Sequence, residues 1–92
     1  MTARQSYAAD QKVIDSAKIT LVMAIGRWFH SHRVALDLSQ EALAAAVGTL
    51  TQVDVSAVEN GICVQRSHLT DLAKHLGIDQ NSGYLKMYLN LI

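Results

Sequence analysis

The sequence predicts an all-α protein, and three observations support this prediction. Apolar residues recur at steps of three and four along most of the 92 residues, which is the spacing of one face of a helix. The chain contains no proline, the residue that most strongly interrupts a helix. Its glycines fall mainly where an apolar pattern ends. Half of the residues are hydrophobic, so we expect a single domain over residues 1–92 whose core needs neither a metal nor a disulfide.

The first predicted helix covers residues 6–35, as one long helix or as two abutting ones. Apolar positions at helical spacing run from Ala8 to Trp28. No helix-breaking residue occurs in this stretch before Gly26. Phe29 belongs to the inward face. Trp28 is its neighbour and must point in a different direction, so we expect it to pack near the core, against the front of this helix or against a partner subunit.

Two short helices follow, joined by a tight link. Ser39 is suited to cap the first, because its hydroxyl can accept a hydrogen bond from a free amide at the helix start. Gly48 comes where a left-handed residue is needed to end that helix. Thr51 and Asp54 fit the capping-box pattern at the start of the second helix, which Gly61 ends. The inward-facing residues of the two helices are Leu43, Ala44, Val47, Val55 and Val58.

Two further helices complete the predicted fold. Ser67 is expected to cap a helix that Gly77 ends, and a polar segment over residues 79–83 leads to the last helix. That C-terminal helix, at 82–92, carries an apolar stripe that would be unfavourable to expose. It either folds back on the N-terminal part of the chain or forms a dimer interface. We favour dimerisation through Tyr84, Leu85, Tyr88, Leu89 and Ile92.

The central stretch and its flanks resemble the Xre/Cro-type helix-turn-helix family. The resemblance is carried by LSQEALA from Leu38, VENG from Val58, LAKHLGI from Leu72, and the pair Ile25-Gly26 with Phe29. It covers about residues 25–78 and implies a five-helix, lambda repressor-like helix-turn-helix domain. Residues 1–24 would then be an N-terminal helical extension, and 82–92 an apolar C-terminal helix.

The resemblance also implies roles for individual residues. Arg33 would form a structural ion pair with Glu59. The helix over 51–60 would enter a DNA major groove with its N-terminal end first, where Gln52 could pair with an adenine. Apolar side chains could touch a thymine methyl group, and polar ones could reach phosphates. The expected DNA-binding residues are Gln40, Thr51, Gln52, Val53, Ser56, Ala57, Asn60 and Arg66.

The sequence departs from the family pattern in several places. The link between Gly48 and Thr51 is one residue longer than usual, and His32 occupies a position that is commonly apolar. Asp37 stands where the family often has glycine, although Asp tolerates a left-handed backbone better than most residues. After Gly61 the family often has Lys or Arg, whereas this chain has Ile-Cys-Val-Gln before Arg66.

The charge pattern is unusual for a DNA-binding domain. The formal net charge is zero, although a basic face normally supplies most of the non-specific affinity for DNA. Residues 39–61 contain three acidic residues and no Lys or Arg. This pattern predicts weak, salt-sensitive DNA binding unless a dimer brings Arg66, Arg4 and Lys12 together beside the groove-reading helix.

No pattern of catalytic or metal-binding residues emerges. His30 and His32 are two residues apart on a helix and face different directions. Cys63 with His68 is a lone pair without zinc-finger spacing, orienting acid or glycine-rich loop. We therefore expect no catalytic residue, no metal and no cofactor, and we do not expect an enzyme.

The expected location is the cytoplasm of a bacterium or of a phage-infected cell, associated with the nucleoid. The single cysteine fits a reducing compartment. The N-terminus is polar and lacks the apolar run of a signal peptide. The longest apolar run, 42–47, is far too short to span a membrane, so we expect no membrane partner.

Two functional hypotheses from different classes remain open. The first is a DNA-binding regulator, most simply a dimeric repressor or autoregulator of the phage or mobile-element type acting at a palindromic site. The second is a protein-binding antiactivator, antirepressor or antitoxin that uses the helix-turn-helix scaffold without DNA. It is motivated by the absence of basic residues and by the apolar residues Val53, Ala57, Ile62 and Val64.

Overall fold

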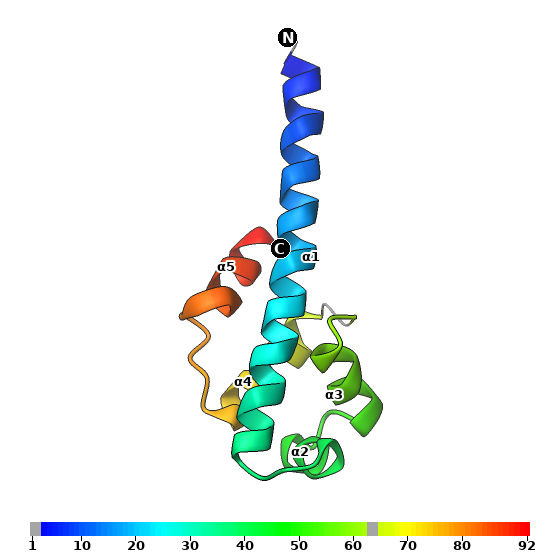
Figure 1. The fold of residues 1–92 in the computed structure, drawn as a ribbon, viewed down its shortest axis with the longest axis vertical. Helices are drawn as coiled ribbons and strands as arrows, with labels where there is room; N and C mark the ends of the chain where they lie inside the picture. Colours follow the sequence, from blue (N-terminus) through cyan, green and yellow to red (C-terminus); the bar gives the residue numbers. More distant parts are fainter. Residues whose placement is uncertain (1–2, 63–64) are drawn as a thin grey trace.

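The computed structural model describes the backbone of residues 3–62 and 65–92 and the side chains of that range from residue 15 onward. Within these residues it contains five helices and no strand. The helices are α1 Ala3–Ala35, α2 Gln40–Val47, α3 Gln52–Glu59, α4 Arg66–Leu76 and α5 Gly83–Leu91 (Figure 1). This confirms the predicted all-α, five-helix fold, and it shows that residues 6–35 lie in one continuous helix. Among the described helices, none is long and apolar enough to cross a bilayer.

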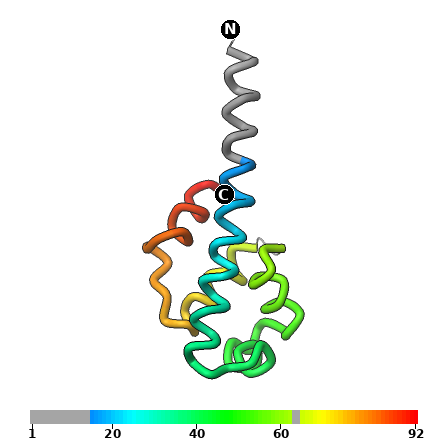
Figure 2. The backbone as a smooth tube through the Cα atoms, in the orientation of Figure 1, coloured from blue at the N-terminus to red at the C-terminus, as the bar shows by residue number. Residues whose placement is uncertain are grey.

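Helix α1 is the element on which the others are assembled. Helix α3 lies along one side of it and α5 along the other, while α2 lies near its C-terminal end and packs on α3 and α4 (Figure 1). The tube in Figure 2 shows that α5 brings the C-terminus back beside α1, where Ile92 shares the lining of a surface cavity with Lys18 and Ile19. The predicted apolar C-terminal helix therefore packs on α1 within the same chain.

A single cluster of apolar side chains joins all five helices. Ile25 and Phe29 of α1 are at most 1% exposed, as are Val55 of α3 and Leu85 of α5. Burying such side chains is the main driving force for folding a chain of this size. The remaining buried members are Leu21, Val22, Leu43, Ala44, Leu50, Val58, Leu69, Leu72, Ala73, Leu76, Ile78 and Tyr88.

Gly26 allows α3 to approach α1 unusually closely. A Cβ atom at this position would lie 2.6 Å from the carbonyl oxygens of both Val58 and Glu59. No side chain fits such a space without moving backbone. Gly26 therefore permits the short distance between α1 and the C-terminal end of α3.

The predicted helix ends of the central stretch are formed by local hydrogen bonds. Ser39 Oγ accepts a hydrogen bond from the Ala42 amide at 3.0 Å, and Gly48 is left-handed with φ of 82°. The Thr51–Asp54 capping box is complete. Asp37 has φ of 59°, as expected for a residue that replaces glycine at a turn. Local chemistry thus fixes both ends of α2 and the start of α3.

The link between α2 and α3 is held in place by burial and by one hydrogen bond. Leu50 inserts into the core and is 8% exposed. Thr49 donates a hydrogen bond from Oγ1 to Asp71 on α4 at 3.3 Å. The link is therefore anchored at two points.

Two sequence-based expectations are wrong. Ser67 does not cap the fourth helix, because α4 begins one residue earlier, at Arg66, and Gln65 is its N-cap without a side-chain hydrogen bond. The first backbone hydrogen bond of α4 runs from the Leu69 amide to the Gln65 carbonyl oxygen at 3.3 Å, so Ser67 already lies inside the helix. Leu85 and Tyr88 are 0% and 2% exposed, so these two residues are not available as a dimer interface. Their apolar stripe is covered by α1 of the same chain.

Candidate nucleic-acid interface

Helices α2 and α3 present a continuous exposed surface opposite the core. Val55 and Val58 point inward from α3. On the outer surface Gln52 and Asn60 are exposed, and Ser56 and Ala57 are partly covered. Val53 is 70% exposed, which is high for a valine. The structure thus places the predicted residues of α3 along one accessible side of this helix.

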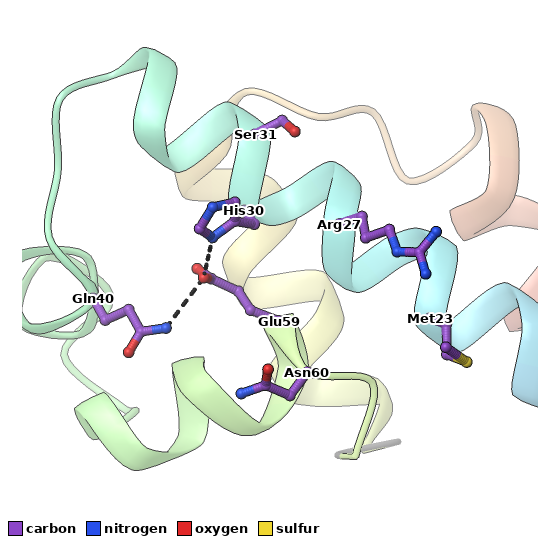
Figure 3. A pocket seen from close by; sticks show the side chains of 7 residues that line it. All are labelled: Met23, Arg27, His30, Ser31, Gln40, Glu59 and Asn60. Carbon is purple, nitrogen blue, oxygen red and sulfur yellow. Dashed lines mark hydrogen bonds and ion pairs between the residues drawn. The ribbon is translucent and has the colours of Figure 1, made fainter.

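A pair of glutamine side chains joins the N-terminal ends of α2 and α3. Gln52 donates a hydrogen bond from Nε2 to Gln40 Oε1 at 2.7 Å. Gln40 in turn donates from Nε2 to Glu59 Oε1 at 3.1 Å, and Figure 3 shows this second contact. The chain of hydrogen bonds fixes the direction of the Gln52 amide. It leaves the Gln52 carbonyl oxygen and one N–H group unengaged by any described residue.

The glutamine pair is anchored on an ion pair between α1 and α3. Arg33 donates from Nε to Glu59 Oε2 at 2.7 Å and from Nη2 to Oε1 at 3.0 Å. It also donates from Nη1 to the carbonyl oxygen of Leu38 at 2.7 Å. The side chains of Arg33 and Glu59 are 11% and 5% exposed. The structure therefore brings together the two residues for which an ion pair was predicted, and the guanidinium also holds the turn that precedes α2.

The surroundings of Glu59 keep its carboxylate ionised. Burial by itself raises the pKa of this carboxyl, but hydrogen bonds from Arg33, His30 and Gln40 oppose it, and the net result is a pKa below the ordinary value of 4.5. The pKa of Arg33 is raised, chiefly by its hydrogen bond to Glu59. Both groups are therefore charged at neutral pH, and each compensates the other.

His30 also belongs to this network, a role that its sequence pattern did not predict. Its Nδ1 lies 2.8 Å from Glu59 Oε1. The spacing in the sequence could have indicated this contact, because His30 is three residues before Arg33 and both therefore lie on the same face of α1. His32, in contrast, contacts the Trp28 carbonyl oxygen through Nδ1 at 3.1 Å. The two histidines are thus engaged in different environments.

Asp54, in the first turn of α3, takes part in the capping box at the start of this helix. Asp54 accepts a hydrogen bond from the Thr51 backbone amide at 2.9 Å, and Thr51 Oγ1 accepts one from the Asp54 amide at 3.3 Å. The bond from the Thr51 amide is the main cause of a lowered pKa at Asp54. The carboxylate is thus directed at backbone rather than at an incoming phosphate.

Arg66 is separate from the glutamine pair. Its Nη2 donates to the carbonyl oxygen of Leu89 on α5 at 3.0 Å, and it lines a cavity together with Lys86. The structure does not bring this predicted DNA-binding residue to Gln40 or Gln52. Of the other residues weighed in the sequence, Cys63 and Val64 and the side chains of Arg4 and Lys12 lie outside the described part of the chain.

The described residues include no group of three or more His, Cys, Asp or Glu side chains that could hold a metal ion. The polar side chains that gather around Glu59 bond to one another and to backbone. Their arrangement orients the amides of Gln40 and Gln52 and balances the charge of Glu59.

Together, two short capped helices in tandem, an outward-facing second helix and a supporting ion pair define a helix-turn-helix protein. A family model described as helix-turn-helix matches residues 30–80, which is more than half of the chain. The chain belongs to this family, of the Xre/Cro type. The family consists of DNA-binding transcriptional regulators that are not enzymes, and this places the protein in that class. No curated protein and no solved structure matches the chain.

Proposed function

We propose that the protein recognises a specific double-stranded DNA site by inserting α3 into the major groove, with Gln52 at the base edges. The observation that carries this proposal is the chain of hydrogen bonds from Arg33 through Glu59 and Gln40 to Gln52. A side chain that is held in place before binding loses little conformational freedom on contact. Its free carbonyl oxygen and N–H match the acceptor and donor pattern of an adenine.

The other predicted contacts are distributed around Gln52. Val53 and Ala57 lie on the same face of α3 and are suited to touch a thymine methyl group. Ser56 and Asn60 are suited to phosphate contacts, as are Gln40 and Thr51 at the two helix starts. Asn60 is already directed by a hydrogen bond from Nδ2 to the Ser56 carbonyl oxygen at 2.8 Å.

We further propose that the protein acts as a homodimer on a palindromic site, as a repressor or autoregulator encoded by a bacterium or a phage. One copy has a formal net charge of zero, and two copies would double the number of contacts with the DNA backbone. The outer side of α5 supports such pairing, because Tyr84 and Met87 are 51% and 56% exposed. Of the interface residues expected from the sequence, Tyr84, Leu89 and Ile92 keep part of their surface accessible.

The first test is a titration of the purified protein against DNA from around its own gene, at low and at moderate salt. We expect saturable binding that weakens with salt, because phosphate contacts release counterions. Gln52→Ala removes a bidentate base contact worth about 1–3 kcal/mol. It should therefore weaken binding to the specific site by roughly 5- to 150-fold and change binding to unrelated DNA much less.

Gln80→Ala is the matched control, because Gln80 is exposed in the segment between α4 and α5. This variant should bind like the wild type. If a folded wild-type protein does not bind the regional DNA at low salt, the proposal fails. It also fails if Gln52→Ala and Gln80→Ala bind specific DNA equally well.

The exposure of two apolar residues keeps the second hypothesis open. Val53 and Ile62 are 70% and 74% exposed, and Ile62 is tied to α3 by a hydrogen bond from its amide to the Ala57 carbonyl oxygen at 2.9 Å. Such residues would suit a protein partner that covers this side of α3. The same titration separates the two functions, since a protein-binding module would show no salt-dependent DNA binding and no effect of Gln52→Ala.

A further inference from the structure

An open cavity, lined mostly by polar residues, lies between α1 and the C-terminal end of α3, beside the proposed recognition surface (Figure 3). It has a volume of about 660 Å³. Helix α1 contributes one wall, and the start of α2 and the end of α3 contribute the rest. Its lining residues are Met23, Arg27, His30, Ser31, Gln40, Glu59 and Asn60.

The lining of the cavity includes one basic side chain, Arg27, that has no ion-pair partner among the described residues. The one carboxylate in its lining, Glu59, is matched by Arg33 at 2.7 Å and contacted by His30 at 2.8 Å. Arg27 is exposed, and no described residue forms a hydrogen bond or ion pair with it. The charge of Glu59 is therefore balanced within the fold, and the guanidinium of Arg27 remains to attract an anion from outside.

The cavity is continuous with the surface proposed to face DNA. Gln40, in its lining, bonds directly to Gln52, and Asn60, also in its lining, ends α3. When a helix lies in the major groove, the sugar-phosphate strands run along its sides and past its ends. A strand that reached Gln40 and Asn60 would therefore pass over the mouth of this cavity.

We propose that this cavity is a DNA phosphate-binding site in which Arg27, supported by His30 and Ser31, grips the backbone beside Gln40 and Asn60. The inference rests on the proposed DNA-binding function and identifies a source of positive charge that the central stretch lacks. Residues 39–61 contain no Lys or Arg. In this protein the basic contact on that side of α3 comes from Arg27 on α1. Arg27 lies three residues before His30 and six residues before Arg33.

The test is the salt dependence of DNA binding by Arg27→Gln. Each phosphate contact contributes about 0.9 to the slope of log affinity against log salt concentration. Loss of one contact should lower affinity for specific and unrelated duplexes alike and make the slope shallower by about 1. Between about 50 and 200 mM salt, the wild type should lose roughly fourfold more affinity than the variant does.

Lys86→Gln is the matched control, because it removes the same charge from α5, where Lys86 lines a different cavity with Arg66. It should leave the slope unchanged. Arg27→Lys should restore most of the slope. The thermal unfolding of all three variants should resemble that of the wild type, because neither the Arg27 nor the Lys86 side chain forms a hydrogen bond or ion pair with a described residue.

The outcomes separate this inference from the function on which it rests. If the wild type binds DNA and Arg27→Gln changes the slope no more than Lys86→Gln does, the phosphate site is refuted and the proposed function stands. If Arg27→Gln alters the preferred sequence while the slope is unchanged, Arg27 reads bases and the phosphate site is again refuted. If the wild type binds no DNA, both proposals fail.

Discussion

At the scale of single residues, Gly26 determines how closely α3 can approach α1. Glycine in the middle of a helix is normally unfavourable by about 1 kcal/mol relative to alanine. Here the missing side chain lets the carbonyl oxygens of Val58 and Glu59 approach to 2.6 Å from the position that a Cβ would take. This close approach puts Glu59 within reach of Arg33, so that one small residue on α1 supports the network behind Gln52.

We therefore expect Gly26→Ala to destabilise the protein, against the usual trend for a helix. The added methyl group must push α3 away, and overpacking of this kind costs about 1–3 kcal/mol. Urea unfolding followed by circular dichroism measures the change. Thr20→Ala is the control, since Thr20 lies on an exposed position of α1 and should gain a few tenths of a kcal/mol from helix propensity. A more stable Gly26→Ala variant would contradict the proposed close contact.

At the scale of helices, α3 and α5 differ in what determines their place. Local caps define α3: the Thr51–Asp54 box begins it, and the amides of Gly61 and Ile62 close it by bonding to the carbonyl oxygens of Val58 and Ala57. Helix α5 lacks a side-chain cap at Ser82. It is positioned by burial of its inner stripe and by an edge-to-face contact between Tyr84 and Trp28, whose ring centroids are 6.5 Å apart.

The outer side of α5 is expected to form the dimer interface, and Met87 tests this expectation. Met87 is 56% exposed and contributes nothing to the core, so a charge at this position should leave the monomer folded. If α5 pairs with its copy, Met87→Lys should convert the dimer to a monomer, because a desolvated charge at an apolar interface is strongly unfavourable. Sedimentation velocity at fixed protein concentration measures the mass.

Lys86→Glu is a suitable comparison, because Lys86 is the exposed neighbour of Met87 and lines the cavity with Arg66. Its effect on mass should be small. A wild-type protein that sediments as a monomer, or a Met87→Lys variant that sediments as a dimer, would rule out pairing through this side of α5.

At the scale of the whole molecule, the two carboxylates of α3 are engaged by partners within the fold. Glu59 is matched by Arg33, and Asp54 is directed at the Thr51 amide. The pKa of each of these carboxyls is lower in the folded chain than its ordinary value. The folded state therefore binds fewer protons than the unfolded state in mildly acidic solution, and stability should fall as the pH falls.

We expect the free energy of unfolding to be constant near neutral pH and to decrease below about pH 5, as the pH drops past 4.5, the ordinary pKa of Glu59, toward its lower folded value. Glu59→Gln should cost about 2–3 kcal/mol at neutral pH, because it leaves Arg33 without its charged partner. It should also flatten the acid dependence. Urea unfolding between about pH 7 and pH 3 measures both effects.

Glu41→Gln supplies the comparison for the acid experiment, because Glu41 is exposed in the first turn of α2. This variant should retain the steep loss of stability in acid. An equally steep loss in Glu59→Gln would show that the Glu59 network does not control the acid stability of the fold.

The sequence by itself determined the class of fold and the local ends of its central helices. Apolar spacing, the Ser39 cap, the Thr51–Asp54 box and the left-handed Gly48 are short-range features, and short-range chemistry is readable from neighbouring residues. The pairing of Arg33 with Glu59 could also be predicted, although only through the resemblance to a family. These features cover most of the region that the family model matches.

Only the tertiary structure decided what covers each apolar face and which polar groups converge. Leu85 and Tyr88 are buried by α1 of the same chain, and the sequence could not distinguish that arrangement from a dimer, because burial by either partner selects the same apolar stripe. His30, Gln40 and Arg27 gather around one cavity from α1 and α2. That gathering depends on how closely α1 and α3 approach at Gly26, a distance between segments more than thirty residues apart that no local pattern specifies.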